Sequence, residues 1–260
     1  MKYASSLTQA VLLKRYKRFL AEVVLNNQEQ RTIYCPNMGS MMGCDVLGSR
    51  IWFSASPNGR RKFSDTWELV EVNGGHLVCV NVLHTYKLII EAIENGTIAQ
   101  LQGYTRITED LPELADSGLD LMLEKSNNPP GEENLLLLPH EKCFIVAKGV
   151  TLGDEVHRGF FPDSVNERNL QQLRSLIHAK QLGYRAVLFY CVMHTGIERV
   201  FPADHIDSEY GQLLRQAVLN GVELLAYRVN ITMSEITLVK ELEVCVPARL
   251  ICNSRPEKSK

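Results

Sequence analysis

Two ionisable residues lie in otherwise apolar stretches of the sequence and are the first candidates for chemistry. Asp120 interrupts the run LDLML, and Lys148 ends the apolar half of FIVAKGVTL. Alternate side chains of a strand share one face, so Phe144, Val146 and Lys148 are expected to point the same way. A charged group on a buried face costs free energy unless an opposite charge meets it. The pattern therefore predicts an anionic partner for Lys148, and a hairpin between the two strands offers Asp120.

Two interpretations of this pair remain open. An acid on one strand and an acid-x-lysine on the next form the centre of PD-(D/E)xK nucleases, where carboxylates hold Mg²⁺ and the lysine steadies the attacking water or the charged phosphorane. Here the residue two before Lys148 is Val146, which has no atom to offer a metal. A buried Asp120–Lys148 ion pair is therefore at least as good an interpretation as catalysis by these two residues, with Asp120 as a weak metal ligand.

Two clusters of cations point to a polyanion. The stretch KRYKRF contains cations and an aromatic residue suited to phosphate contact and base stacking, namely Lys14, Arg15, Tyr16, Lys17 and Arg18. The turn SPNGRRKF adds Arg60, Arg61 and Lys62. The first 90 residues hold 11 Lys and Arg against 6 Asp and Glu, so positive charge concentrates in this part of the chain. The alternative, a solvated strand edge with two core aromatics, also stays open.

Other common chemistries find no support in the sequence. The seven cysteines form no CxxC and the seven histidines show no HxxxH or paired Cys/His spacing, so a zinc site is not expected. No GxSxG, GxGxxG or P-loop pattern is present. Scattered cysteines, no secretory signal and no apolar run near 20 residues favour a reduced, cytoplasmic protein without a membrane anchor.

The elements that must position these residues divide the chain into two parts. Five short strands separated by turn sequences, within residues 19–83, predict a small β-barrel or sandwich with an OB-like barrel among the options. A helix over 81–96 follows, and then strands at 119–125, 143–152, 185–193 and 222–229 alternate with helices that begin near 164 and 207. We expect domains at 1–82 and 83–250, the second a mixed α/β layer, and a disordered tail at 251–260.

Many segments together resemble one known family. The segments are RYKRFLAEV, YCPNMGSMMGC, RKFSDTWELV, GGHLVCVN, FIVAKGVTL, GFFPDSVNER, GYRAVLFYCVMH and FPADHIDSEYGQLLRQAVLNGVELLAY. They are similar to the sugar fermentation stimulation protein A (SfsA) family from about residue 7 to 246. The resemblance implies an N-terminal OB-fold-like β-barrel followed by a PD-(D/E)xK nuclease-like mixed-sheet α/β domain. It also implies DNA binding without sequence specificity and a regulatory link to sugar (maltose) metabolism in bacteria.

The departures from the family pattern converge on the nuclease-like centre. Asp120 and Lys148 match the family's aspartate and lysine, whereas its glutamate falls at Val146 and the basic residue before its aspartate at Gly118. Residues 169–173 read NLQQL where glycine and basic residues are usual, and Met38 replaces a threonine. We therefore expect a DNA-binding protein that requires no cofactor and has a catalytically impaired site. The alternative is a Mg²⁺-dependent nuclease acting on DNA or RNA through Asp120 and Lys148.

Overall fold

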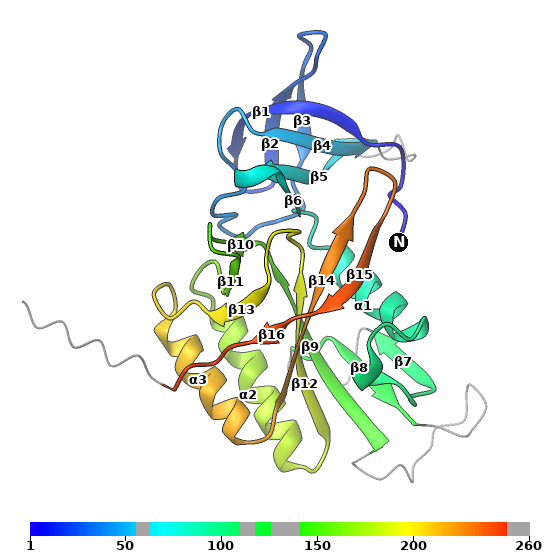
Figure 1. Cartoon of the computed structure of the whole chain (residues 1–260), viewed down its shortest axis with the longest axis vertical. Coiled ribbons are helices and arrows are strands. Elements are labelled where there is room, and N and C mark those ends of the chain that lie inside the picture. The colour runs from blue at the N-terminus through cyan, green and yellow to red at the C-terminus, as the bar shows by residue number, and fades with distance from the viewer. Residues whose placement is uncertain (56–62, 110–117, 126–140, 249–260) are drawn as a thin grey trace, which may run out of the picture.

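The computed structural model describes residues 1–55, 63–109, 118–125 and 141–248 (Figure 1). A β-barrel from the first third of the chain sits above a layered α/β part that contains the remaining helices and strands (Figure 1). The predicted tail at 251–260 lies outside the described residues. Within the described residues, no helix is long and apolar enough to cross a membrane.

The barrel follows the strand order of an OB fold. Its strands are β1 (Thr8–Tyr16), β2 (Leu20–Val24), β3 (Gln30–Tyr34), β4 (Arg50–Ala55), β5 (Asp65–Val72) and β6 (His76–Cys79). They form a sheet in the order β3-β2-β1-β4-β5-β6. A parallel contact of β3 with β5, at Tyr34 and Thr66, closes five of these strands into a barrel. The buried side chains inside include Leu12, Ile33, Phe53 and Trp67.

The predicted barrel is confirmed, with one strand missing from the prediction. Five strands were expected within residues 19–83, whereas β1 already spans Thr8–Tyr16. Only Ala10 and Leu12 of this strand are buried, so its alternation is weak and the cations at its end conceal it. The basic run is therefore the far end of β1 and the turn into β2.

The second part is built on a mixed six-stranded sheet. Its strands are β7 (Arg106–Glu109), β8 (Leu121–Glu124), β9 (Lys142–Val150), β12 (Arg185–Val192), β14 (Glu223–Ile231) and β15 (Ile236–Glu241). Their order is β15-β14-β12-β9-β8-β7. The three central strands β14, β12 and β9 are parallel to one another, and the pairs β15–β14, β9–β8 and β8–β7 are antiparallel. A small second sheet contains β10 (Leu152–Gly153), β11 (Arg158–Phe161), β13 (Arg199–Pro202) and β16 (Glu243–Val244).

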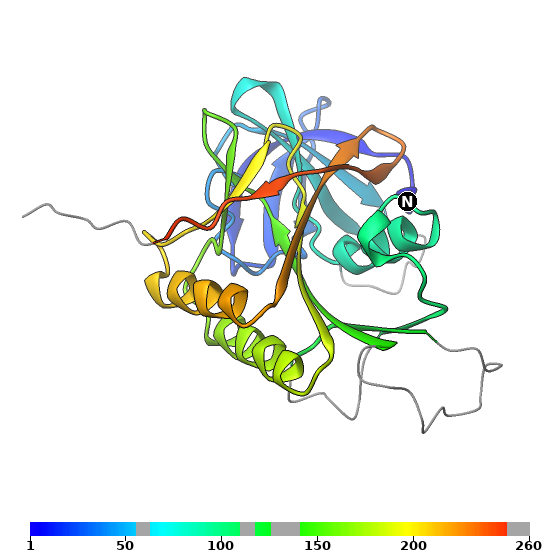
Figure 2. The same cartoon turned by 60° about the horizontal axis from the view of Figure 1, so that its bottom comes forward.

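Three α-helices cover the two faces of this mixed sheet. They are α1 (His84–Glu94), α2 (Glu167–Gln181) and α3 (Ser208–Leu219), and short 3₁₀ turns lie at Asn73–Gly75 and Ala99–Leu101. Helices α2 and α3 lie together on one face, and α1 lies on the other (Figure 2). Strand β9 is buried on both faces: Val146 packs toward α2 and Ile145 toward α1. This double coverage explains its continuous apolar sequence.

The start of α2 differs from the sequence expectation. The sequence predicts a helix that begins near 164, because the spacing of Ser164 and Glu167 in SVNE is that of a capping box. The N-cap is instead Asn166, whose side-chain oxygen accepts from the Arg168 amide at 3.0 Å. Ser164 instead bonds Asp163. The helix therefore begins with its cap two residues further along the chain than expected.

Candidate functional site

Lys148 lies on β9 with its side chain against helix α2. It is 8% exposed, and its ammonium donates to the amide oxygen of Asn169 at 2.7 Å and to that of Gln172. The ring of Phe161 lies 5.7 Å below it, close enough for a cation–π contact. Burial lowers the pKa of Lys148 to about 8, although the charge of Asp120 acts in the opposite direction. The face that Lys148 shares with Phe144 and Val146 is as predicted.

Asp120 lies immediately before β8, and hydrogen bonds occupy both of its carboxylate oxygens. Oδ2 accepts from the Ala147 amide at 2.8 Å, and Oδ1 accepts from the Tyr86 hydroxyl at 3.0 Å. Burial raises the pKa of the Asp120 carboxyl, while the Ala147 hydrogen bond and the Lys148 charge lower it. The carboxylate is thus held by neutral donors, namely a backbone amide of β9 and a tyrosine hydroxyl of α1.

The predicted Asp120–Lys148 ion pair is not formed. No contact within 4.0 Å joins the Lys148 ammonium to the Asp120 carboxylate in the described part of the chain, because Gln172 stands between them. The amide nitrogen of Gln172 lies 3.4 and 3.5 Å from the two carboxylate oxygens and donates to the Gly118 carbonyl at 2.6 Å. Asp120 and Lys148 lie at one site, as the predicted hairpin requires, and Gln172, which links them, was not among the predicted site residues.

Gly118 makes room for this arrangement. Its φ is +68°, a conformation that favours glycine, and a Cβ there would meet the Cγ of Gln172 at 2.9 Å. Asn169 and Gln172 are polar residues at i, i+3 spacing on a helix face otherwise formed by leucines. That spacing of buried amides was the available sequence signal. The departures at Gly118 and in NLQQL therefore belong to one local structure.

Among the residues that the structure describes, this site holds no metal-binding donor set. Val146 is fully buried against the α2–α3 layer, and Glu167 is 74% exposed and pairs with Arg174 at 2.8 Å. Among the described residues, no three His, Cys, Asp or Glu side chains form a group able to hold a metal ion. With one carboxylate whose oxygens are already bonded, the described residues do not fit Mg²⁺ or Ca²⁺, which require several oxygen ligands.

The basic residues of the barrel have different environments. Lys17 and Arg18 form the β1–β2 turn with φ values of +51° and +63°, are exposed, and make no ion pair among the described residues. Phe19 beside them is 39% exposed. Lys14 pairs with Glu22 at 3.0 Å and lies over the ring of Tyr16. Arg60, Arg61 and Lys62 lie outside the described residues, so their part of the prediction stays untested.

Arg15 supports a loop rather than offering a free charge. Its guanidinium donates to the carbonyls of Arg18, Asn37, Gly39 and Ser40, and its side chain is 8% exposed. The loop it holds continues to the α/β part, where the Ser40 hydroxyl donates to the Asp163 carbonyl at 2.7 Å and the Met41 amide to its carboxylate at 3.2 Å. This loop therefore connects the basic turn to the segment that leads into α2.

The fold and this site define a class of protein: an OB barrel joined to a mixed-sheet α/β domain in which a buried lysine and an aspartate share one site. Residues 13–80 match the family model described as the SfsA N-terminal OB domain, and residues 83–235 match the sugar fermentation stimulation protein RE domain. The chain belongs to the SfsA family. It is also similar to a solved structure, "The structure of Pyrococcus Furiosus SfsA in complex with Ca2+", with a TM-score of 0.76 and 21% identity over 94% of this chain and 97% of that one.

Proposed function

We propose that this chain binds DNA without sequence specificity and that its nuclease-like centre does not cleave it. The observation that carries the proposal is the β1–β2 turn, where Lys17 and Arg18 are free of ion pairs within the described structure and Phe19 is partly exposed beside them. Phosphate contacts by such cations give affinity without reading bases, and an exposed aromatic ring stacks on any base. In OB folds this turn borders the nucleic-acid-binding face.

The proposed division of the chain supports this function. We place the DNA-binding domain at 1–82 and the nuclease-like domain at 83–250, and the Arg15-supported loop joins them through Asp163. Nucleic acid bound at the turn would extend toward the start of α2. The family description names sugar fermentation stimulation, and a regulatory role in sugar (maltose) metabolism inside the bacterial cytoplasm is part of the proposal.

The absence of cleavage follows from how the site is filled. Val146 replaces the acid of the motif, Asp120 is bonded on both oxygens, and Gln172 occupies the place between Asp120 and Lys148. Losing a ligand and the metal with it removes several kcal/mol of transition-state stabilisation. No cofactor is required for the proposed binding.

Binding is tested by fluorescence anisotropy on labelled duplex and single-stranded DNA across a salt series. Lys17→Glu/Arg18→Glu should weaken binding at least about tenfold at low salt and reduce the log–log salt slope by roughly 2, since each lost phosphate contact removes about 0.9. Lys87→Glu/Lys240→Glu, an equal charge change at exposed positions elsewhere, is the matched control. Equal weakening by both pairs would show that net charge, and not the turn, governs binding.

The second candidate function is a metal-dependent nuclease acting on DNA or RNA through Asp120 and Lys148. The observation in its favour is the lowered pKa of Lys148, about 8, because perturbed groups gather at catalytic sites. The test is a cleavage assay on plasmid DNA, single-stranded DNA and RNA in the presence of Mg²⁺ or Mn²⁺. Each substrate is incubated separately with the wild-type protein, with Asp120→Ala and with Lys148→Met. Cleavage by the wild type that both substitutions abolish would establish the nuclease and overturn the impaired site.

A further inference from the structure

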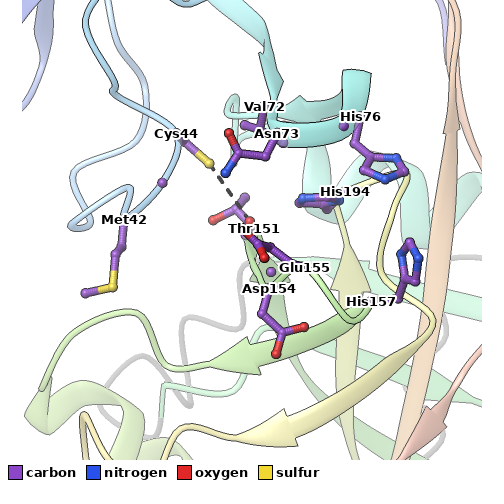
Figure 3. Close-up of a pocket in the computed structure, with 13 residues that line it drawn as sticks. Met42, Cys44, Val72, Asn73, His76, Thr151, Asp154, Glu155, His157 and His194 are labelled. Carbon is purple, nitrogen blue, oxygen red and sulfur yellow. Dashed lines mark hydrogen bonds between the residues drawn. The ribbon is translucent and has the colours of Figure 1, made fainter.

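A pocket of about 390 Å³ lies where the barrel meets the α/β domain, and it shares no lining residue with the Asp120–Lys148 site. Its walls come from the 42–44 loop and the β5–β6 turn of the barrel, and from the segment after β9 and the end of β12 in the α/β domain (Figure 3). Three histidines that are far apart in the sequence meet here. They are His76 of β6, His157 of the β10–β11 turn and His194 after β12.

The charge of the pocket favours a cation. Asp154 and Glu155 line it together with the three imidazoles, and no Lys or Arg is among the lining residues. Anion sites rely on Arg, Lys or clustered amides, whereas imidazole and carboxylate groups offer lone pairs. Imidazole nitrogen suits borderline ions such as Zn²⁺ and Ni²⁺, while Mg²⁺ and Ca²⁺ prefer oxygen alone.

His157 is oriented as a metal-binding histidine is. Its Nδ1–H donates to the Gly196 carbonyl at 2.8 Å, which leaves the lone pair of Nε2 free. Histidines that ligate metals generally donate their other N–H to a carbonyl or carboxylate in this way. His76 has no hydrogen bond from either ring nitrogen among the described residues, and its ring centre lies 5.8 Å from that of His157. Two rings on one tetrahedral ion, with metal–nitrogen distances of about 2.0–2.1 Å, have centres roughly 5 Å apart.

His194 has a different role. Its Nδ1 accepts from the Gly196 amide at 2.9 Å, so the neutral ring carries its hydrogen on Nε2 and offers no lone pair there. Burial lowers the pKa of His194 to about 4, and the neighbouring His76 and His157 add to this effect. Its ring packs 5.7 Å from His76 and supports that side chain.

Among the other possible metal ligands that line the pocket, Glu155 is the one that remains available. The Cys44 thiol is buried and directed at the Thr151 carbonyl, 3.9 Å away. Asp154 already accepts from the amides of Val156 and Arg158 and from the Arg158 guanidinium. Glu155 is exposed, makes no ion pair in the described residues and stands two positions before His157 in the same turn.

We propose that this pocket binds a borderline divalent transition-metal ion, of the Zn²⁺ and Ni²⁺ class, through His76 and His157, with Glu155 as the third ligand. No three such side chains already converge in the described structure, so the proposal requires the exposed side chain of Glu155 to turn inward when the ion binds. His76 belongs to the barrel and His157 to the α/β domain, and a bound ion therefore ties the two together. The site is separate from the nuclease-like centre and does not depend on the proposed function.

Binding is measured on the full chain by isothermal titration with ZnCl₂ and NiCl₂, with CaCl₂ and MgCl₂ as comparison ions. His76→Gln and His157→Gln should each weaken Zn²⁺ binding at least about tenfold, because each removes one of two nitrogen ligands. Glu155→Gln should weaken it less. His178→Gln, which changes an exposed histidine of α2, is the matched control and should leave binding within about twofold. Unchanged binding in His76→Gln and His157→Gln, or equal affinity for Ca²⁺, overturns the proposal.

A measurement on the wild type does not depend on how the variants fold. Paramagnetic Ni²⁺ should broaden the imidazole NMR signals of His76 and His157 first, with those of His178 and His205 unaffected at equal metal. Added Zn²⁺ should also raise the unfolding temperature, because an ion that binds only the folded state stabilises it. Broadening that begins at His178 or His205 would show adventitious surface binding and would overturn the site.

Discussion

Asp120 and Lys148 belong to one hydrogen-bonded group without touching each other, because the amide of Gln172 lies between them. Its oxygen accepts from the Lys148 ammonium, and its nitrogen lies 3.4 Å from the nearer Asp120 oxygen. A neutral amide can serve a cation and an anion at once, since it has both an acceptor and a donor end. The two side chains thereby belong to one internally bonded group.

Removing this bridge should destabilise the fold. Gln172→Leu leaves Lys148 and the Gly118 carbonyl each without one partner, and we expect the free energy of unfolding to fall by about 1 to 3 kcal/mol. Gln216→Leu changes an exposed glutamine of α3 and should stay within about 0.5 kcal/mol of the wild type. Urea unfolding followed by circular dichroism gives both values. Equal effects of the two substitutions would contradict the bridging role.

Lys148 should make the free energy of unfolding depend on pH in the alkaline range. Its pKa is about 8 in the folded chain and 10.5 as a free side chain. Between these values the unfolded chain holds a proton that the folded chain has lost, so this group makes the folded state more stable as pH rises. The free energy of unfolding of the wild type relative to Lys148→Met should therefore rise by about 2 to 3 kcal/mol from pH 7.5 to 10.5.

The control for this titration is Lys240→Met, at an exposed lysine of β15. The difference in the free energy of unfolding between Lys240→Met and the wild type should stay constant over the same pH range. Buried cysteines and tyrosines titrate in all three proteins and cancel in the differences. A flat difference for Lys148→Met would show that the lysine is neutral, or fully charged, throughout the range.

Two neighbouring arginines should separate stability from DNA binding. Arg15→Gln removes hydrogen bonds to four backbone carbonyls and should lower the free energy of unfolding by about 1.5 to 3 kcal/mol. Arg18→Gln removes an exposed side chain and should change it by less than about 0.5 kcal/mol while weakening DNA binding. Thermal unfolding and anisotropy on the same preparations test this. The opposite ranking in stability would refute the structural role of Arg15.

A buried carboxylate fastens the barrel to helix α1. Glu68 is 3% exposed and accepts from Ser54 at 2.7 Å, from Asn81 at 2.8 Å and from His84 Nε2 at 2.7 Å. Burial raises its pKa, but these hydrogen bonds prevail and lower the pKa below 4.5. Glu68→Gln should cost about 1 to 3 kcal/mol at pH 7, and Glu94→Gln, at an exposed site, almost nothing.

The lowered pKa of Glu68 also predicts how the free energy of unfolding changes in acid. Its folded pKa lies below its unfolded one, so its contribution is present above pH 4.5 and is lost as pH falls through the folded pKa. The difference in the free energy of unfolding between the wild type and Glu68→Gln should therefore become smaller below pH 4.5. Urea midpoints at pH 7, 5 and 4 measure it. A difference that widens on acidification would contradict the lowered pKa.

The sequence by itself determined the element types, the barrel followed by an α/β layer, and the pairing of the Asp120 and Lys148 strands. These follow from local periodicity and turn residues, and from hydrophobic runs such as β9 and β12 that are buried on both faces. It missed β1, the edge strands β7 and β15, and the strands β11, β13 and β16 of the small second sheet. Edge strands are short or only partly buried, and their alternation is correspondingly weak.

Only the tertiary structure decided which side chains meet. Gln172 lies 24 residues beyond Lys148, and its position between the Lys148 and Asp120 side chains depends on how α2 packs against β9. The same holds for His76 and His157, whose spacing in the sequence matches no metal motif but whose rings lie 5.8 Å apart. Local sequence fixes a residue's face on its own element, whereas contacts between distant elements arise from how the layers pack.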